Sequence, residues 1–321
     1  MIRYEQDQSV EMKNLNMIKS NFLLASGPVK NSIIAFLHPL RRPISWACQR
    51  RFLPSGIRHL LPWRWALEPF SVYGQNWKFL WVPAEFDDIV HGLFWSGLCS
   101  FESETMCVIM GQIRQARCFV DVGANCGIYT VLGATINKQI QIIAIEPVPR
   151  ICAALVRNVS QNKFDTRVTI LNIAAGNCDA IVDFHEAEYA GMGSLAVQGY
   201  QGQPGRLIRV QCRKLDSVAS ELNIEPDLIK IDAEGFSDAV LSGASRLLDK
   251  VRPRIVLEAN PGDAVLRITE ILTAHRYAMH LITDTGPELR EEIIASAKYR
   301  NWLCLPLGQD DRKVPIAEVE V

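Results

Sequence analysis

The chain has 321 residues, of which 48% are hydrophobic and 21% are charged, and these proportions are ordinary for a soluble globular protein with a sizeable core. The net charge of −1 indicates no partner by itself, and no apolar run reaches the ~20 residues that a membrane-spanning helix needs, so we expect a soluble, cytoplasmic protein. The nine cysteines are spaced singly without a CxxC pair, which argues against a zinc ribbon or a thioredoxin-like site and favours reduced, buried thiols.

The first 70 residues differ from the rest of the chain in charge. They carry ten basic and four acidic residues, a net charge of +6, whereas the remainder carries 24 basic and 31 acidic residues, a net charge of −7. Prolines interrupt this stretch and aromatic residues alternate with the basic ones, so we predict an irregular helical extension over residues 1–70. Three roles stay open for it: a solvated cap on the following domain, a peripheral contact with acidic lipid or a polyanionic substrate carrier, and a contact with nucleic acid. We expect no nucleic-acid partner, because no recognised nucleic-acid-binding fold accompanies the charge.

Residues 71–310 are predicted to form one domain, and residues 311–321 a C-terminal tail. A strand pair and helices extend to about residue 115, and "NWKFLWVP" is the clearest strand among them. Strand-length apolar runs follow at 118–123, 140–146, 167–174, 227–234, 253–260, 277–283 and 301–307, with helical stretches at 126–137, 149–162, 236–249 and 262–275. Apolar strands separated by helices indicate a doubly wound α/β fold, whose mostly parallel sheet is covered on both faces. We expect one antiparallel strand at the C-terminal edge of this sheet.

An insertion separates the third and fourth strands of this alternation. The segments "AIVDFHEA" and "LIRVQCRKL" have the pattern of a hairpin-like strand pair, and "YAGMGSLAVQGYQGQPG" lies between them. A glycine-rich connection of this length is typical of a functional loop. We therefore expect residues 186–206 to contribute a lid or a substrate-binding loop.

The stretch "FVDVGANCGIYT" is predicted to be a strand, a tight turn and the start of a helix. It does not match the dinucleotide pattern GxGxxG, because Asn125 stands at the second glycine position, and no GK[ST] follows as a Walker loop requires. Gly123 and Gly127 let the backbone approach a ligand closely, and the helix start supplies free N–H groups. The carboxylate of Asp121 would repel a diphosphate and would suit a cofactor that carries a cationic amine.

A second acid, Glu146, follows the next strand, 23 residues after Gly123. Because the carboxyl ends of parallel strands meet at one edge of a sheet, Glu146 is expected beside Asp121. An acid at this position typically binds the two hydroxyls of a ribose.

Four motifs together resemble the FkbM family of S-adenosylmethionine-dependent methyltransferases. They are "FVDVGANCGIYT", "AIEPVPRICAALVRNV", "LNIAAGN" and "DLIKIDAEGFSDAVLSGA", in this order and spacing, and "FESET" and "GMGSL" resemble two further segments of the family. The resemblance covers about residues 75 to 285 and implies a Rossmann-like class I methyltransferase fold with S-adenosyl-L-methionine as cofactor. The chain departs from the family pattern at Cys126 and Ala233, and it retains Asp232 and Glu234.

The resemblance also implies roles for individual residues. The methionine side of the cofactor pocket would be formed by Asp121, Gly123, Ala124, Asn125 and Gly127. Glu146 would bind the ribose, and the backbone around Ala174 would lie near the adenine. The acceptor would be a small molecule or a sugar-containing metabolite, methylated on a hydroxyl.

Asp232 and Glu234, at the tip of the fourth predicted strand, are the candidate catalytic residues. A methyl group on a sulfonium is already activated, so the enzyme has to align the acceptor and remove its proton. The two carboxylates could act as a base, as a pair that orients the acceptor, or as part of a divalent metal site. Two carboxylates are too few to argue for a metal, and none is assigned.

Several alternatives stay open. Asp121 could cap its own turn, and Asp232 and Glu234 could cap the helix near Phe236. Lys230 could pair with a carboxylate, and Glu258 closes the fifth predicted strand. His91 and His185 are alternative bases. The rival functions are an N-methyltransferase and a non-catalytic scaffold that binds the cofactor.

Overall fold

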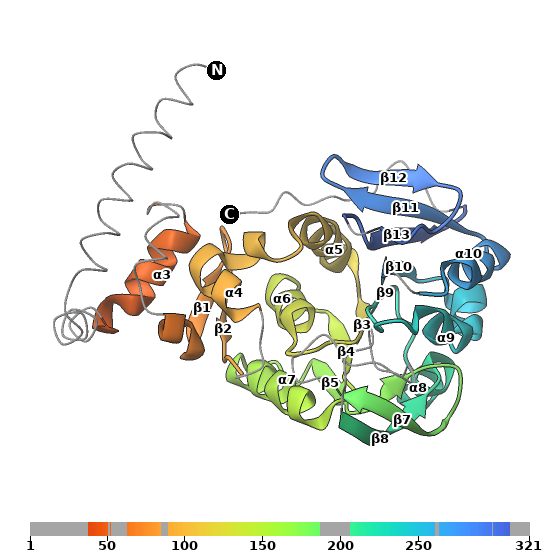
Figure 1. Cartoon of the computed structure of the whole chain (residues 1–321), viewed down its shortest axis with the longest axis horizontal. Helices are drawn as coiled ribbons and strands as arrows, with labels where there is room; N and C mark the ends of the chain where they lie inside the picture. The colour runs from red at the N-terminus through yellow and green to blue at the C-terminus, as the bar shows by residue number, and fades with distance from the viewer. Residues whose placement is uncertain are drawn as a thin grey trace, which may run out of the picture.

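The computed structural model describes residues 38–50, 52, 63–84, 89–186, 206–260, 263–296 and 298–308. The predicted loop over 186–206 falls almost wholly outside these residues, as do the segment "GMGSL", most of the basic N-terminal stretch and the tail over 311–321. Within them the predicted α/β class is confirmed, because one large, mostly parallel sheet is packed between helices (Figure 1).

The central sheet has eight strands in the order β12-β11-β13-β10-β9-β3-β4-β5. Their bounds are β3 (Cys118–Val122), β4 (Gln141–Ile145), β5 (Val168–Leu171), β9 (Leu228–Ile231), β10 (Arg254–Glu258), β11 (Tyr277–Thr283), β12 (Gly286–Arg290) and β13 (Asn301–Pro306). The five adjacent strands β5, β4, β3, β9 and β10 are parallel to one another. The chain order reverses direction between β3 and β9, and this is the point at which doubly wound sheets bind their ligands.

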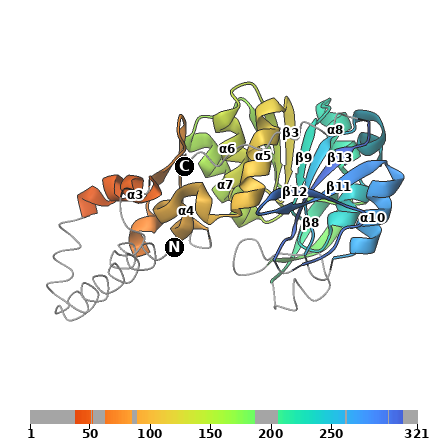
Figure 2. The same cartoon turned by 90° about the horizontal axis from the view of Figure 1, so that it is seen from above.

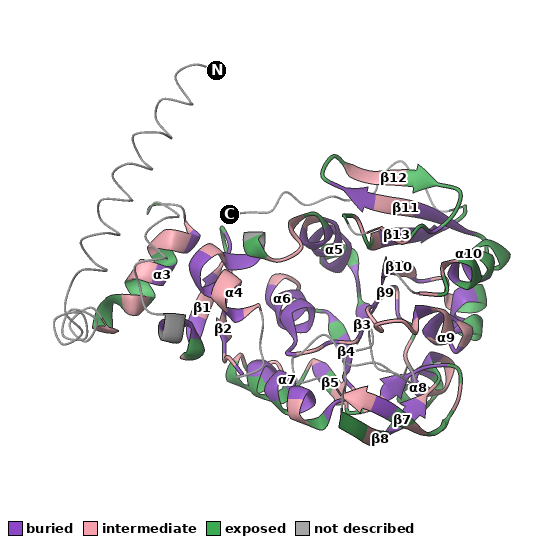
Figure 3. Cartoon of the chain, viewed as in Figure 1, coloured by how far each residue is buried: buried purple, intermediate pink, exposed green. Residues whose placement is uncertain are grey.

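An antiparallel strand, β12, lies at the predicted edge of the sheet, and a second antiparallel strand, β13, was not predicted. β13 is antiparallel to both neighbours, but it is inserted between β10 and β11, and the edge of the sheet is β12, which pairs antiparallel with β11. Burial is the reason, because Trp302, Leu303 and Cys304 are all 0% exposed and need a layer on each face and a strand on each side. The outer strand β12 is half-buried at residues 286–288 and exposed at Leu289 and Arg290 (Figure 3).

Helices cover both faces of the sheet, as Figure 2 shows. One face carries α5 (Ser103–Gln115), α6 (Ile128–Ile136) and α7 (Pro149–Gln161), and the other carries α8 (Leu215–Leu222), α9 (Ser237–Ser242) and α10 (Val265–Ala274). Side chains alternate between the two faces along each strand. Phe119 thus packs in the α5–α6 core and Val120 in the α9–α10 core. By the same alternation, Asp121 belongs to the α6 face.

The helix predicted over 236–249 is shorter than expected. α9 ends at Ser242, and a separate π-helical turn covers Leu247–Val251. Gly243 stands at the break, where the chain approaches Gly176 so closely that a Cβ would lie 2.0 Å from its carbonyl oxygen. Asp216 then accepts the N–H groups of Arg246 and Leu247 and starts the second turn.

The insertion forms a small sheet of its own. Its strands are β6 (Ala174–Ala175), β7 (Ala180–Glu186) and β8 (Arg206–Arg213), in the order β6-β8-β7. The predicted strand pair is therefore confirmed, with Ala180 opposite Cys212 and Glu186 opposite Arg206. The third predicted strand was too long, because β5 ends at Leu171 and Ala174 belongs to the small sheet.

The N-terminal elements pack against the α6 side of the domain. They are η1 (His38–Leu40), α3 (Arg41–Gln49), η3 (Trp63–Leu67), β1 (Phe70–Tyr73), β2 (Lys78–Trp81), α4 (Val90–Ser96) and η4 (Gly97–Ser100). β1 and β2 form the predicted antiparallel pair. Trp65 and Phe70 are buried in the same core cluster as α6, and Gln49 donates to the carbonyl oxygens of Ser71 and Phe94. The described part of residues 1–70 is thus attached through its own buried side chains, and the boundary at residue 70 stays a prediction.

The eight cysteines with described side chains are all free thiols. Five of them, Cys118, Cys126, Cys152, Cys212 and Cys304, are buried, as predicted. Among the described residues, no helix has the length and apolar character needed to cross a bilayer.

Candidate functional site

The turn after β3 has a backbone conformation that requires glycine at two positions, Gly123 and Gly127. Gly123 has a φ of 73°, and a Cβ there would lie 1.9 Å from the carbonyl oxygen of Asp232. Gly127 has a φ of 96°, and a Cβ there would lie 2.4 Å from Cδ1 of Leu155. Asn125 between them is also left-handed, with a φ of 52°. The two glycines therefore allow β3 to turn tightly against the end of β9 and lead into α6.

Glu146 joins this turn to the next one. Its carboxylate is 5% exposed and accepts the backbone N–H of Asn125 at 3.0 Å and that of Val148 at 2.9 Å. Burial raises the pKa of Glu146 to about 7, and the two backbone N–H groups oppose that rise by stabilising the ionised form. Glu146 is therefore a buried acid whose ionised form is stabilised by two fixed backbone dipoles.

A pocket opens at the carboxyl edge of β3, β4 and β9. Six of the predicted site residues line it, and they are Gly123, Asn125, Glu146, Ala174, Asp232 and Glu234. Its other walls include the apolar side chains of Val148, Ile151, Phe184 and Phe236. The space free of atoms is about 650 Å³, and part of it is open solvent. Elements far apart in sequence thus place their candidate residues around one cavity.

Three of the predicted residues do not line this pocket. They are Asp121, Ala124 and Gly127, and Ala124 acts through its backbone N–H, which donates to the carbonyl oxygen of Ile145 at 3.0 Å. Asp121 is fully buried behind the pocket, where Thr130 in the first turn of α6 donates to it at 2.6 Å. Burial raises the pKa of Asp121, and the charge of Lys230 opposes that rise. The alternative in which Asp121 holds its own turn therefore has direct support.

Asp232 and Glu234 follow β9 and face the pocket. The capping alternative has no support, because the N-terminus of α9 at Phe236 shows no side-chain capping bond. The predicted pairing of Lys230 is confirmed, since its Nζ lies 3.0 Å from Oδ2 of Asp232. Glu234 has a φ of 39°, and burial, followed by the charges of Asp232 and Asp263, raises its pKa to about 9. The raised pKa favours the protonated form of Glu234 beside Asp232.

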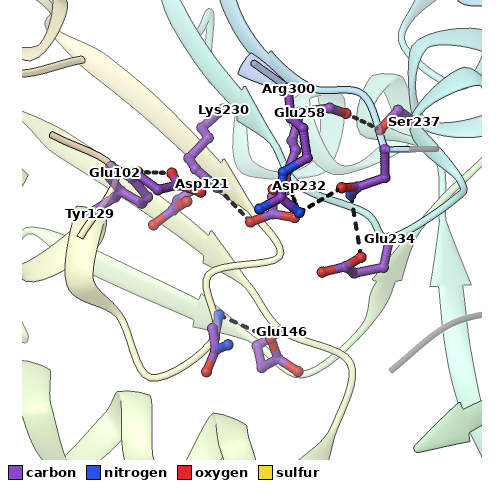
Figure 4. A network of polar contacts seen from close by, with 12 residues as sticks. Glu102, Asp121, Tyr129, Glu146, Lys230, Asp232, Glu234, Ser237, Glu258 and Arg300 are labelled. Carbon is purple, nitrogen blue, oxygen red and sulfur yellow. Dashed lines mark hydrogen bonds and ion pairs between the residues drawn. The ribbon is translucent and has the colours of Figure 1, made fainter. Parts of the chain in front are cut away.

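Further polar residues surround Asp232 (Figure 4). The hydroxyl of Tyr129 donates to Glu102 at 2.6 Å, and its ring centroid lies 4.7 Å from Nζ of Lys230. Arg300 lies 3.5 Å from Glu258 and also donates to Asn260, whose amide in turn donates to Glu234.

Sequence reasoning assigned no role to Tyr129, Asn260 or Arg300. Tyr129 lies inside the quoted motif "FVDVGANCGIYT", and this was the available signal. Arg300 precedes β13 by one residue, and nothing in the sequence indicated that β13 lies beside β10.

Neither alternative base lines the pocket, since His91 belongs to α4 and His185 to β7. Among the described residues, no group of three or more His, Cys, Asp or Glu side chains has the arrangement of a metal site. The divalent metal stays unassigned.

Comparisons with known proteins point to one family. A profile of the methyltransferase FkbM domain matches residues 121–279. The comparison with curated proteins gives no match. Among solved structures, a methyltransferase FkbM from Methylobacillus flagellatus KT is 16% identical, with a TM-score of 0.43 over 68% of this chain. The match spans only 53% of that chain's length.

Two other solved structures are similar at a lower level. The precorrin-6y C5,15-methyltransferase from Geobacter metallireducens GS-15 is 14% identical, with a TM-score of 0.38 over 63% of this chain and 86% of that chain. An O-methyltransferase from Bacillus cereus in complex with SAH is 13% identical, with a TM-score of 0.34 over 63% of this chain and 78% of that chain.

Proposed function

Because the chain belongs to the FkbM methyltransferase family, we propose that it transfers a methyl group from S-adenosyl-L-methionine to an oxygen of a small molecule or sugar-containing metabolite. One observation carries this proposal. The pocket presents Glu146, held by two backbone N–H groups, on one wall and Asp232 on the other, with the bare backbone of Gly123 between them. This arrangement suits a ligand that combines neighbouring hydroxyls with a positive charge.

The residues present fit the adenosyl cofactor. Glu146 keeps lone pairs on both oxygens beyond its two backbone bonds and would accept the hydroxyls of a ribose. Val148, Ile151 and Phe184 form an apolar wall suited to an adenine ring, next to the backbone of Ala174. The carboxylate of Asp232 would face the positive sulfonium of the cofactor, a charge that S-adenosylhomocysteine lacks. The charged side chains among the described residues that line the pocket are all acidic, which disfavours the diphosphate of a dinucleotide.

The proposed chemistry assigns different tasks to the two catalytic candidates. Bound S-adenosyl-L-methionine supplies a methyl group that its sulfonium has already activated. Asp232, with Lys230 at 3.0 Å, is the ionised carboxylate that accepts the proton of the acceptor hydroxyl. Glu234, whose pKa is raised to about 9, donates a hydrogen bond that orients the acceptor oxygen.

Isothermal titration with S-adenosylmethionine, S-adenosylhomocysteine and NAD tests the proposal. We expect binding of both adenosyl ligands and none of NAD, and we expect methyl transfer to at least one hydroxyl compound in a broad acceptor panel. Preference for NAD would show that the cofactor assignment is wrong. Tight adenosyl binding without turnover on any acceptor would favour the scaffold alternative.

The N-methyltransferase alternative makes a different prediction. A nitrogen acceptor with a low pKa is largely unprotonated and needs little help from a base. Asp232→Asn would then slow turnover far less than Glu146→Ala. If the acceptor is an oxygen, both substitutions should slow turnover strongly.

We also propose that the N-terminal elements contact an acidic lipid surface. The outer side of η1 and α3 exposes Leu40 (48%) and Trp46 (39%), and Phe52 (70%) lies 5.5 Å from Trp46 between ring centroids. Between Glu11 and Glu68 the chain has nine basic and no acidic residues, which complements an anionic surface. Co-sedimentation with vesicles of phosphatidylglycerol and with neutral vesicles tests this contact. We expect binding to the anionic vesicles only, reduced in Phe52→Ser; equal binding of that variant would contradict the proposal.

A further inference from the structure

Lys230 is a buried ammonium in the middle of the candidate site. It lies on β9, opposite Asp121 of β3 and Val256 of β10, and its side chain is only 3% exposed. A buried cation costs several kcal/mol unless it is paired. Its ion pair with Asp232 and its position over the ring of Tyr129 supply that pairing. Lys230 therefore stays charged and is directed at one carboxylate, Asp232.

Glu258 is the second carboxyl group beside Asp232. It ends β10, its side chain is 8% exposed, and it lies within hydrogen-bonding contact of Asp232. Two ionised carboxylates in contact in a buried site repel each other strongly, so one of them holds a proton. Burial, followed by the charge of Asp232, raises the pKa of Glu258 to about 10.

One atom of Asp232 indicates where the proton belongs. Among the described residues, Oδ1 of Asp232 is buried and has no hydrogen-bond donor, while Oδ2 accepts from Lys230. A protonated Glu258 supplies a donor for Asp232, whereas an ionised Glu258 would place a second anion beside it. Buried oxygens without a donor are rare, which favours the protonated form.

The surroundings of the two groups favour the same assignment. Asp232 has the lysine at 3.0 Å and a side chain that is 26% exposed, so its charge is both paired and partly solvated. Among the described residues, the ion-pair partner of Glu258 is Arg300, at 3.5 Å, and that arginine is 46% exposed, so water screens its charge. The ionised form is therefore more stable on Asp232 than on Glu258.

We propose that Asp232 and Glu258 share a single proton and that Lys230 keeps it on Glu258, so that Asp232 meets the acceptor as the ionised member of the pair. Lys230 and Glu258 are positioning residues in this arrangement, and the inference rests on the proposed function only in assigning the base to Asp232. The charged and titratable groups around the pair are Glu102 before α5, Asp121 on β3, Tyr129 on α6, Glu146 after β4, Lys230 on β9, Glu234 after β9, Asp263 before α10 and Arg300 before β13.

Carboxyl protonation is measured directly by NMR on the full chain labelled with ¹³C in the Asp and Glu carboxyl groups. The two signals are identified by their loss in Asp232→Asn and in Glu258→Gln. We expect Glu258 to remain protonated above about pH 8, far beyond the ordinary glutamate value of about 4.3, and Asp232 to be ionised at neutral pH. A Glu258 signal that titrates near its ordinary value would overturn the proposal.

Replacing the lysine tests its part. In Lys230→Met the charge is gone and the length is kept, so the titration midpoint of Asp232 should rise by at least about one pH unit, a tenfold change in proton affinity. Lys230→Arg is the matched control and should keep the midpoint close to the wild-type value. Once an acceptor has been identified, Lys230→Met should also move the acidic limb of the plot of kcat/KM against pH to higher pH. An unchanged Asp232 midpoint in Lys230→Met would overturn the proposal.

Should Lys230→Met fail to fold, Glu258→Gln decides the matter, because glutamine has the shape of a protonated glutamate without the charge. If Glu258 is already neutral, this variant keeps the Asp232 midpoint. If Glu258 is ionised, the variant removes a neighbouring anion, and the Asp232 midpoint falls clearly. These titrations need neither cofactor nor turnover, so their outcome is independent of the binding and acceptor experiments that test the proposed function.

Discussion

Glu146 and Glu258 occupy corresponding positions in the sheet but differ in environment. Glu146 directly follows β4 and Glu258 ends β10, and they are 5% and 8% exposed. Burial raises the pKa of both, to about 7 for Glu146 and to about 10 for Glu258. Two backbone N–H groups oppose the rise at Glu146, whereas the charge of Asp232 adds to it at Glu258. Burial alone therefore does not decide the charge of an acid at a strand end; its nearest partners do.

The N–H groups at Glu146 come from the turn that the glycines shape. The left-handed residue Asn125 directs its N–H at the carboxylate, and Val148 does so from the following turn. These dipoles are held by the backbone and need no ordering when the acid ionises. At Glu258 the partners are side chains that carry charges of their own.

The largest effect is expected from the turn itself. Gly123→Ala would force a Cβ to within 1.9 Å of the Asp232 carbonyl and strain a φ of 73°, so it should lower the free energy of unfolding by about 4 kcal/mol. Urea denaturation measures this. Gly308→Ala is the control, because Gly308 also has a positive φ, 94°, but nothing lies within 4 Å of its Cβ position, and it should cost only about 1 kcal/mol. Equal losses in the two variants would show that the approach to β9 is not tight.

Next in size is the removal of the proposed base. Asp232→Asn keeps the shape of the side chain and its contact with the pocket, so S-adenosylhomocysteine affinity should stay within about threefold. Methyl transfer to a hydroxyl acceptor should slow by about 100-fold, the lower range for loss of a general base. Single-turnover rates and titration calorimetry separate the two effects. A rate within about tenfold of the wild-type rate would show that another group acts as the base.

Glu146→Ala should act on binding. Removing the carboxylate that we propose accepts two ribose hydroxyls should weaken S-adenosylhomocysteine binding by about 30-fold, or about 2 kcal/mol. Calorimetry on the variant measures the change, and Glu270→Ala, at an exposed acid on α10, is the control that should bind like wild type. Wild-type affinity in Glu146→Ala would remove the basis of the cofactor assignment.

The two glutamates should also be separable by the pH dependence of stability. A carboxyl group whose pKa is raised on folding binds its proton more tightly in the folded state. Its contribution to stability is therefore complete below about pH 4.5, the value for an unperturbed glutamate, and is lost as pH rises to the folded-state value. In Glu146→Gln, the loss of stability between about pH 4.5 and pH 7 should disappear. In Glu258→Gln, the loss of stability that disappears should extend from about pH 4.5 to about pH 10.

The expected slope is about 1.4 kcal/mol per pH unit for each proton. Urea denaturation measures this slope for the wild type and both variants, over a range of roughly pH 5 to pH 9. If both variants changed the slope over the same range, the environments of the two glutamates would not differ as described.

Much of the fold was predictable because its signals are local. Apolar runs such as "CFVDVG" and "PRIVLEAN" mark buried parallel strands, and β3, β4, β9 and β10 all formed where these runs lie. The insertion of β13 between β10 and β11 was not predictable, since its apolar pattern suits an interior or an edge strand equally. The end of α9 at Ser242 lies where Gly243 approaches Gly176, which comes from a different element.

The sequence by itself determined which residue types stand at the strand ends. The spacing of Asp121, Gly123, Glu146, Asp232 and Glu234 along a strand–helix alternation was sufficient to place them at one edge of the sheet. Only the tertiary structure decided that Asp121 lies behind the pocket, that Glu258 adjoins Asp232 and that Arg300 arrives from the reversed strand. The reason is physical: which residues lie at a strand end depends on local pattern, whereas the charge state of a buried acid depends on partners that the fold brings in from distant parts of the chain.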